Sequence, residues 1–331
     1  MKKILTVAIP TYNRSKQLEL RLNELLPQLT LEVVIRVFDN GSKDQTAEIV
    51  RKYESQAVHL TRSEFNAGGP RNVTRCIEES ETEWVWLMGD DDFIKPDAVE
   101  IVLKAIKNTT SNAIQFSWTS REFSNETSFA SLDDLYNNHN VQELYCISAL
   151  AFRREALTHL FMQLNLACLT YFPQTILILK MLDKGDGALL VHPGRIFTVA
   201  GGAKRWSTLD VARGLSLLPE FINDSKIRKT VASEVLMDVL WMLVFGLREV
   251  HNKKTAFEWK TNVKRVISIP KIYGARRFFL GTKRRRPNKK ELKNYYLNLF
   301  CLYSPSIVAV LLGRHLRNKH DGGISSVESE F

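Results

Sequence analysis

Residues 83–93 read Glu-Trp-Val-Trp-Leu-Met-Gly-Asp-Asp-Asp-Phe, an apolar run that ends in three consecutive carboxylates. The apolar part predicts a buried strand, which places Asp90, Asp91 and Asp92 at its carboxyl end. Neighbouring carboxylates repel one another, so this arrangement needs a compensating cation. A divalent metal that also binds a phosphate is the cation that such a cluster favours.

Two other apolar runs end in polar clusters in the same way. Residues 4–13 predict a strand that breaks at Pro10-Thr11-Tyr12-Asn13-Arg14, and residues 33–38 predict one that ends at Asp39-Asn40-Gly41-Ser42. In an open parallel α/β sheet, ligands bind outside the carboxyl ends of the strands. We therefore expect the three polar clusters to converge on one site.

Strand and helix patterns alternate along the first 200 residues, which predicts an α/β fold with a mostly parallel sheet. A polar stretch at residues 120–140 is expected to shape an acceptor pocket, and the pattern becomes helical from about residue 208. The predicted helices are 15–29, with Ser15 as a possible N-cap, and 44–53, 70–77, 96–106 and 172–182. The further predicted strands are 58–60, 83–88, 113–119, 145–152 and 188–199.

Composition places the chain among globular proteins. Its 331 residues are 44% hydrophobic, enough for one large core or two smaller ones. The net charge of +10 is uneven: residues 248–319 carry 19 Lys and Arg against 3 Glu, a net +16, and the rest carries 27 basic and 33 acidic residues, a net −6. This asymmetry indicates an anionic partner, either a nucleic acid or the anionic cytoplasmic face of a membrane.

The cysteines and the N-terminus indicate the compartment. Cys76, Cys146, Cys168 and Cys301 lie far apart without a Cys-x-x-Cys pair, which favours reduced thiols over a zinc site or a disulfide framework. The first residues enter a strand directly, with no long apolar stretch and no small-residue cleavage site. We therefore expect a cytoplasmic protein.

Four motifs together resemble the family 2 glycosyltransferases with the GT-A fold. In order they are Ile9-Pro10-Thr11-Tyr12-Asn13-Arg14, Asp39-Asn40-Gly41-Ser42-Lys43-Asp44-Gln45-Thr46, Asn66-Ala67-Gly68-Gly69-Pro70-Arg71-Asn72 and Gly89-Asp90-Asp91-Asp92. The resemblance covers about the first hundred residues and extends more faintly to about residue 206. It implies a Rossmann-like GT-A domain over residues 1–206, followed by a helical, basic domain over residues 207–331.

The resemblance also implies which residues bind a nucleotide-sugar donor. Asp39 would accept a ring N–H of the nucleobase, although Asp39-Asn40-Gly41 is also a good turn sequence. Gly68-Gly69 would let a phosphate approach the backbone beside Arg71 and a helix start, with a plain glycine loop as the alternative. The basic loop 204–206 would close over the diphosphate. The expected donor-binding residues are Pro10, Tyr12, Arg14, Asp39, Asn40, Gly68, Gly69, Arg71, Asp90, Lys204 and Arg205.

The acidic run departs from the family's usual Leu-Asp-x-Asp-Asp. Gly89 stands at the first Asp and Asp90 at the x position, so Asp91-Asp92 and Asp90-x-Asp92 both stay open as metal-binding pairs. We expect Asp91, together with Asp92, to hold Mn²⁺ or Mg²⁺, whose remaining ligands would be phosphate oxygens. The structural alternative is an acidic turn that caps the helix after residue 96.

The general base is the least defined part of the expected mechanism. Inverting transfer requires a group, usually a carboxylate, that takes the proton of the acceptor hydroxyl. The family's acidic pair falls here on Pro173-Gln174, and an amide is not a base. Asp92 is the candidate for the base by position. His192 could approach the metal, but a single His after a strand is more often a structural residue than a ligand. Other candidates for the base are Asp133, Asp134, Asp183 and Asp186.

The basic C-terminal part interleaves charge with aromatic residues and short apolar runs between residues 271 and 317. This pattern is typical of attachment to a membrane interface without a spanning segment. A solvated basic face over a helical core is the alternative. No nucleic-acid-binding motif is recognisable, and no nucleic acid is expected as a partner.

These observations predict an inverting, metal-dependent glycosyltransferase. It would move one sugar from a nucleotide-sugar donor to a lipid-linked bacterial surface glycan at the inner face of the cell membrane. The bacterial setting and the glycan class follow from the resemblance alone. Gly202 stands where processive relatives have Gln, which argues against polymerisation. The alternative is a GT-A-like binding module that has lost catalysis and attaches to membrane or nucleic acid through its basic C-terminal part.

Overall fold

The computed structural model describes residues 2–55, 57–118, 124–199 and 208–232, together with Val235 and Val239. The predicted loop residues Lys204 and Arg205 and the basic segment 271–317 lie outside these residues. Chain contacts separate two compact units: the described residues up to Val199 belong to the first together with 220–228, and helix α9 (Thr208–Leu217) belongs to the second. Each unit is described by itself.

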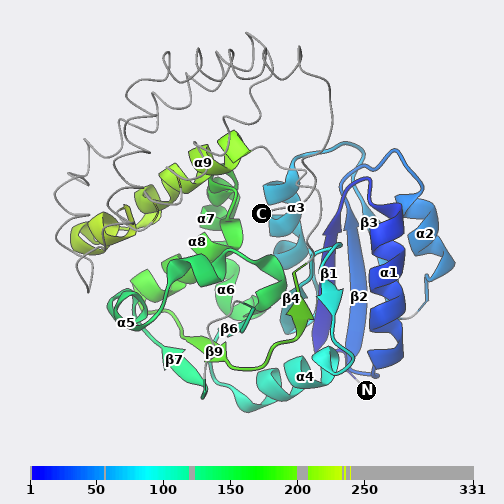
Figure 1. Cartoon of the computed structure of the whole chain (residues 1–331), viewed down its shortest axis with the longest axis horizontal. Coiled ribbons are helices and arrows are strands. Elements are labelled where there is room, and N and C mark those ends of the chain that lie inside the picture. Colours follow the sequence, from blue (N-terminus) through cyan, green and yellow to red (C-terminus); the bar gives the residue numbers. More distant parts are fainter. Residues whose placement is uncertain are drawn as a thin grey trace, which may run out of the picture. The chain divides into compact units, whose positions relative to one another are not determined.

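An eight-stranded sheet forms the centre of the described part of the first unit, in the order β3-β2-β1-β4-β8-β6-β9-β7 (Figure 1). Strands β3, β2, β1 and β4 are mutually parallel, β8 runs antiparallel to β4 and β6, and β9 is parallel to β6 and antiparallel to β7. Strands β5 (Phe93–Ile94) and β10 (Phe197–Thr198) form a separate antiparallel pair. The sheet strands are β1 (Leu5–Thr11), β2 (Val33–Asp39), β3 (Val58–Arg62), β4 (Trp84–Leu87), β6 (Ala113–Phe116), β7 (Thr127–Phe129), β8 (Leu150–Arg153) and β9 (Leu189–His192).

The helices lie on both sides of the sheet. In Figure 1, α1 and α2 stand together beside β1 to β3, and the contacts group α3 with α7 and α8. Short 3₁₀ segments connect several elements, and they include η1 (Leu26–Gln28), η2 (Val141–Leu144) and η3 (Ile147–Ala149). The helices are α1 (Ser15–Leu25), α2 (Thr46–Lys52), α3 (Gly69–Glu78), α4 (Ala98–Asn108), α5 (Leu132–Asn138), α6 (Arg154–Leu157), α7 (Phe161–Leu166) and α8 (Pro173–Lys184).

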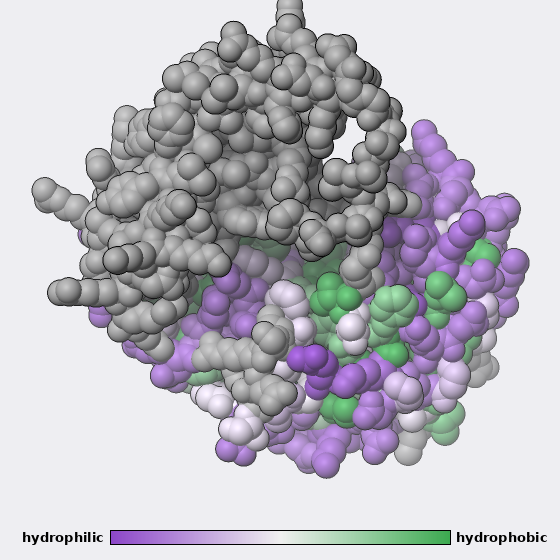
Figure 2. Space-filling model, in the orientation of Figure 1, coloured by the Kyte–Doolittle hydropathy of each residue, from purple (hydrophilic) through white to green (hydrophobic). Residues whose placement is uncertain are grey.

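The core explains why these segments form these elements. Strands β1 and β4 are buried almost throughout, as expected for central strands that are covered on both faces. Apolar side chains at helical spacing, such as Leu18 and Leu22 of α1 and Val102 and Ile106 of α4, join the same core cluster as β1. The described surface in Figure 2 is mostly hydrophilic, with apolar residues in small separate patches. Within the described ranges, no helix has the length and apolarity needed to cross a membrane.

The α/β class and the mostly parallel sheet are confirmed, but three local predictions are wrong. Ser15 is the first residue of α1 rather than its N-cap, and its backbone N–H donates to the Asp44 carboxylate (3.2 Å). The stretch 145–152 is a strand only from Leu150, because side chains of other elements bind the carbonyl oxygens of Tyr145 and Ser148. The stretch 188–199 is two strands separated by Pro193 and its neighbours, and residues 127–129 form an unpredicted strand.

Candidate functional site

The three predicted polar clusters meet at one edge of the sheet, which confirms the expected convergence. The hydroxyl of Thr11, at the end of β1, donates to Oδ2 of Asp90 in the turn after β4 (2.7 Å). The backbone N–H of Asn40, just after β2, donates to the carbonyl of Thr11 (3.0 Å). Parallel pairing of β2, β1 and β4 places these strand ends side by side.

Asp39 ends β2 with a fully buried side chain. Its Oδ1 accepts the backbone N–H of Ser42 (2.9 Å), as expected for a turn residue. Its Oδ2 accepts no hydrogen bond from the described residues, although Nε of Arg62 forms an ion pair with it at 3.2 Å. Buried carboxylate oxygens normally accept hydrogen bonds, so Oδ2 is a ready acceptor for a ligand N–H. Arg62 is 44% exposed and also donates from Nη2 to the carbonyl of Ser42 (2.6 Å), so a ligand N–H would replace its ion pair with Asp39.

The glycine loop before α3 is tied to β2 by Asn40. The Asn40 amide donates to the carbonyl of Gly68 (3.1 Å) and accepts from the N–H of Ala67 (3.0 Å). Gly68 has φ +90°, which favours glycine, and Gly69 opens the helix. The structure thus gives Asn40 the role of shaping this loop, next to a helix N-terminus that suits a phosphate.

The remaining predicted donor residues lie nearby with different partners. Pro10 and Tyr12 are partly buried where β1 ends. Arg71 is turned along its own helix, where its guanidinium donates to Thr74 (2.7 Å) and pairs with Glu78 (2.6 Å). A role of Arg71 on a phosphate therefore requires that its guanidinium leave Glu78.

The three carboxylates of the acidic turn each have a different partner. Asp90 and Asp92 are buried, and their Oδ2 atoms accept hydroxyl hydrogen bonds from Thr11 and Ser148 respectively. Asp91 is 43% exposed, and Nη2 of Arg14 lies 3.3 Å from its Oδ2. The expected mutual repulsion is thus relieved by divergent side chains and by an arginine cation.

The carboxylates of this turn fit a divalent cation that takes most of its ligands from substrate phosphates and water. Among the residues the structure describes, no group of three or more His, Cys, Asp or Glu is placed to form a metal cage. Asp91 offers an accessible carboxylate, and the Arg14 guanidinium already stands there as a cation. Oxygen ligands suit Mg²⁺ and Mn²⁺, and Mg²⁺ is commonly held by one or two carboxylates with substrate phosphates and water.

The weaker candidates for the base are engaged in other contacts. Asp183 lies 3.7 Å from Lys180 at the far end of α8, and Asp186 pairs with His159 at 2.8 Å. His192 is bound through both ring nitrogens, to Glu126 and to the N–H of Gly194. Desolvation lowers the pKa of His192. His192 is therefore best explained as a structural residue.

Gln174, at the position of the family's acidic pair, is almost completely buried at the start of α8. Its Nε2 donates to the carbonyl of Tyr145 (3.0 Å), so it anchors the chain before η3. Asp133 and Asp134 lie in the first turn of α5, capped by Ser131.

Sequence reasoning missed two residues of the site. Ser148 binds Asp92 from η3, and Arg21 on α1 donates from Nη1 to the carbonyl of Asp92 (2.5 Å). Both are almost fully buried. Two features of the sequence could have drawn attention to them: a serine lies within the apolar run 147–152, and an arginine lies on the apolar face of α1. Neither feature shows that the side chain binds Asp92.

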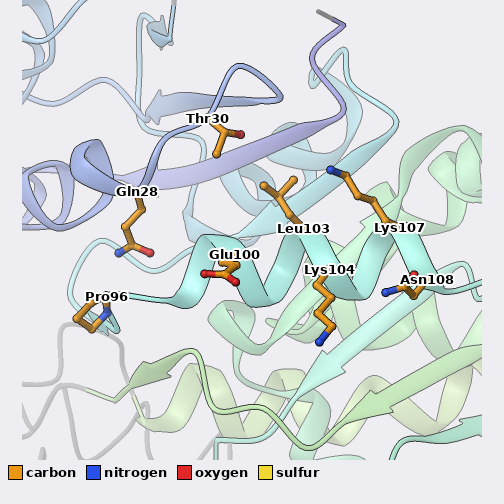
Figure 3. Close-up of a pocket in the computed structure, with 8 residues that line it drawn as sticks. All are labelled: Gln28, Thr30, Pro96, Glu100, Leu103, Lys104, Lys107 and Asn108. Carbon is orange, nitrogen blue, oxygen red and sulfur yellow. The ribbon is translucent and has the colours of Figure 1, made fainter.

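A groove of about 650 Å³ lies away from this site, between η1 and α4 (Figure 3). None of the predicted site residues that the structure describes lines it. Its lining residues are Gln28, Thr30, Pro96, Glu100, Leu103, Lys104, Lys107 and Asn108.

Comparisons with known proteins agree with this fold and its motifs. The model of glycosyl transferase family 2 matches residues 6–161. Poly(ribitol-phosphate) beta-N-acetylglucosaminyltransferase TarS of Staphylococcus aureus is 36% identical over 103 residues, 29% of this chain and 17% of that protein. Abequosyltransferase RfbV of Salmonella typhimurium is 29% identical over 104 residues, 30% of this chain and 31% of that protein. The chain thus matches less than a third of the length of these two relatives.

Solved structures share the fold at low sequence identity. The S. aureus TarS fragment 1-349 superposes with a TM-score of 0.59 at 18% identity and covers 82% of both chains. The mannosyltransferase PcManGT from Pyrobaculum calidifontis, solved with GDP-Man and Mn²⁺, gives 0.53 at 15% identity and covers 85% of this chain and 86% of that chain. From the matched motifs, the sheet and these relatives, we conclude that residues 6–161 belong to glycosyl transferase family 2 and lie in a domain with the GT-A fold.

Proposed function

We propose that this protein is an inverting, metal-dependent glycosyltransferase that moves one sugar from a nucleotide-sugar donor to a lipid-linked acceptor of a bacterial surface glycan. One observation carries the proposal. The Oδ2 atom of Asp39 is buried and accepts no hydrogen bond from the described residues. The carboxylate of Asp91 is accessible and lies at the same edge of the sheet, where β2 and β4 end. A nucleoside diphosphate needs both, an acceptor for its base and a cation site for its phosphates.

In this proposal the donor extends from β2 to the turn after β4. Asp39 accepts a ring N–H of the base, while Pro10, Tyr12 and Arg14 border the base and ribose. The diphosphate lies by the loop that Asn40 shapes, at the N-terminus of α3. Arg71 reaches it after leaving Glu78, and Lys204 and Arg205 are proposed to contact it from a loop outside the described residues.

The proposed metal site consists of Asp91 with Asp92, and Asp90 stays bound to Thr11 on the ribose side. A bound Mn²⁺ or Mg²⁺ supplies charge neutralisation for the departing diphosphate. The solved TarS complexes with UDP and UDP-GlcNAc and the PcManGT complex with Mn²⁺ belong to proteins of the same fold. Asp92 is proposed as the base that takes the acceptor proton, because Gln174 has no basic group.

A thermal-shift screen tests the proposed function. UDP, GDP, CDP, TDP and the matching sugar nucleotides are added with Mn²⁺ or Mg²⁺ and with EDTA. A ligand present at about 100 times its Kd stabilises the folded state by about 2.7 kcal/mol, so one base should raise Tm clearly more than the others. EDTA should remove most of that increase. If none of the nucleotides changes Tm with either metal, the protein is not a nucleotide-sugar enzyme of this kind.

Gln174 also favours a second candidate, a GT-A-like binding module without catalysis, because its buried amide replaces an acid of the family. Such a module would bind the nucleotide but release no nucleoside diphosphate from a sugar nucleotide. Slow hydrolysis of the donor, measured as nucleoside diphosphate release without an acceptor, separates the two candidates.

We further propose that the basic C-terminal segment attaches the protein to the anionic inner face of the cell membrane. Each basic residue near an anionic surface contributes about 1 kcal/mol. Reversal of Arg284, Arg285 and Arg286 to Glu should release the protein from phosphatidylglycerol vesicles, as high salt should, and leave nucleotide binding unchanged. Cosedimentation of the triple variant at the wild-type level would exclude electrostatic attachment through these residues.

A further inference from the structure

Ser148 lies outside the sequence motifs and contacts the acidic turn through its side chain. Its side chain is fully buried on η3. The hydroxyl donates its proton to Oδ2 of Asp92 (2.5 Å) and accepts the backbone N–H of Gly89 (2.9 Å). One hydroxyl therefore joins the two ends of the turn 89–92, and its bond to a carboxylate is of the stronger, charge-assisted kind.

The segment that carries Ser148 is itself held in place. The indole N–H of Trp86, buried in β4, donates to the carbonyl of Ser148 (2.9 Å). Upstream, Thr175 and Gln174 of α8 donate to the carbonyls of Leu144 (2.8 Å) and Tyr145 (3.0 Å). Because strand and helix both fix this segment, the hydroxyl is pre-oriented toward Asp92.

The glycine in this turn is explained by the same contact. A Cβ added to Gly89 would lie 3.0 Å from Oδ2 of Asp92 and 3.1 Å from Oγ of Ser148, both tighter than ordinary contacts. The family signature has an Asp at this position. Here the space beside the backbone is filled by the Ser148 and Asp92 pair, so the glycine and the serine belong to one arrangement.

Arg21 of α1 holds Asp92 through its backbone carbonyl. Its Nη1 donates to the Asp92 carbonyl and pairs with Glu24 (2.9 Å), and its guanidinium lies over the Phe93 ring at 4.6 Å from the centroid. Asp92 is thus held at its side chain by η3 and at its backbone by α1. The turn has little freedom left, and Asp91 is the carboxylate that it presents outward.

We propose that Ser148 is a positioning residue of the active site: through Asp92 and the Gly89 amide it fixes the acidic turn, so that Asp91 and Asp92 are set to receive the metal and diphosphate. This inference rests on the proposed function for its catalytic consequence. Its geometric basis is independent of any ligand.

The geometric basis is tested by a stability cycle of Gly89→Ala, Ser148→Ala and the double variant, followed by thermal unfolding. Each single change should lower Tm, since one adds a close contact and the other removes a buried hydrogen bond. Together they should lower Tm by less than the sum, because the serine oxygen that opposes the added methyl group is gone in the double variant. Strict additivity would show that the two residues do not share this contact and would overturn the proposal.

The catalytic consequence is tested with Ser148→Ala, the hydroxyl-retaining Ser148→Thr, and Ser80→Ala as a matched control. Ser80 is an equally buried serine whose hydroxyl donates to the carbonyl of Cys76 (2.6 Å), away from the turn. Loss of a residue that orients a metal ligand typically weakens metal affinity about 10- to 100-fold. We expect Ser148→Ala to raise the Mn²⁺ concentration for half-maximal nucleoside diphosphate release by about 10- to 100-fold. Ser148→Thr should restore part of the lost Mn²⁺ affinity. Ser80→Ala should lower Tm and leave the Mn²⁺ requirement unchanged.

Mn²⁺ is also titrated calorimetrically into protein saturated with the nucleoside diphosphate that the thermal-shift screen selects. This measurement gives a readout that does not depend on turnover. Unchanged Mn²⁺ affinity and half-saturation in Ser148→Ala would overturn the proposal and leave Ser148 a structural residue. If wild type binds none of the screened nucleotides, the proposed function fails, and the stability cycle still decides whether the contact exists.

Discussion

The two halves of the described GT-A sheet form their parts of the site by different means. In the half from β1 to β4, parallel pairing alone brings the ends of the strands to one edge, where Thr11 and Asp90 meet directly. In the half from β6 to β9, β8 runs antiparallel and the chain returns to the site through η2 and η3. Individual side chains from β4 and α8 must hold that return segment. The first half is therefore set by topology and the second by specific hydrogen bonds.

The largest expected effect tests the parallel half at Asp91. Asp91→Asn should leave Tm nearly unchanged, because the side chain is half-exposed, but lower kcat/KM for transfer by about a factor of 1000, or about 4 kcal/mol, since a metal carboxylate is lost. The same change at Asp97, an exposed residue just before α4, is the control and should be neutral. Turnover near the wild-type rate in folded Asp91→Asn would remove Asp91 from the metal site.

Asp39→Asn should have a smaller effect, confined to nucleotide binding. The loss of a charge-assisted hydrogen bond to the base should weaken binding of the nucleoside diphosphate by about 2 kcal/mol, roughly 30-fold in Kd. The Mn²⁺ requirement should stay as in wild type. Calorimetry showing equal affinities for both proteins would make Asp39 a turn residue only.

The second half is tested at Gln174, where the family acid can be restored. Gln174→Glu should destabilise the fold by about 1 to 3 kcal/mol, because a buried carboxylate would face the Tyr145 carbonyl in place of an N–H donor. Turnover should not rise. Gln174→Met, which removes the hydrogen bond without adding a charge, should cost less stability. A gain in transfer rate in Gln174→Glu would instead show that the base position of the family is intact here.

The smallest effect concerns Asp44, which connects two helix starts in the first half. Its carboxylate accepts the N–H of Ser15 at α1 and that of Thr46 at α2. Desolvation raises the pKa of Asp44, but the hydrogen bonds from Thr46 and Ser15 together outweigh it, and the pKa lies below its ordinary value.

Asp44→Ala should cost about 1 kcal/mol of unfolding free energy at pH 7, measured by urea denaturation. The stabilisation by Asp44 is present above its unfolded pKa of about 3.9 and is lost as pH falls through the lower folded pKa, so wild type and variant should converge below pH 4. An equal difference at pH 7 and pH 3 would contradict this assignment.

The same contrast explains what could be predicted from the sequence. The strands of the parallel half are continuous apolar runs with polar ends, so their positions and their convergence at Asp39, Thr11 and Asp90 follow from pattern and topology. The roles of Ser148 and Arg21 depend on long-range pairings between segments that carry no common pattern. Likewise, the segment before Leu150 is not a strand because side chains of β4 and α8 bind the carbonyl oxygens of Ser148 and Tyr145.

A crystal structure of the protein with Mn²⁺ and the nucleoside diphosphate selected by the thermal-shift screen tests the central claim most directly. The account predicts the base against Oδ2 of Asp39 and an anomalous manganese peak at Asp91, with Arg14 displaced from that carboxylate. A nucleotide bound in the groove between η1 and α4, beside Lys104 and Lys107 and with no metal at the acidic turn, would contradict it.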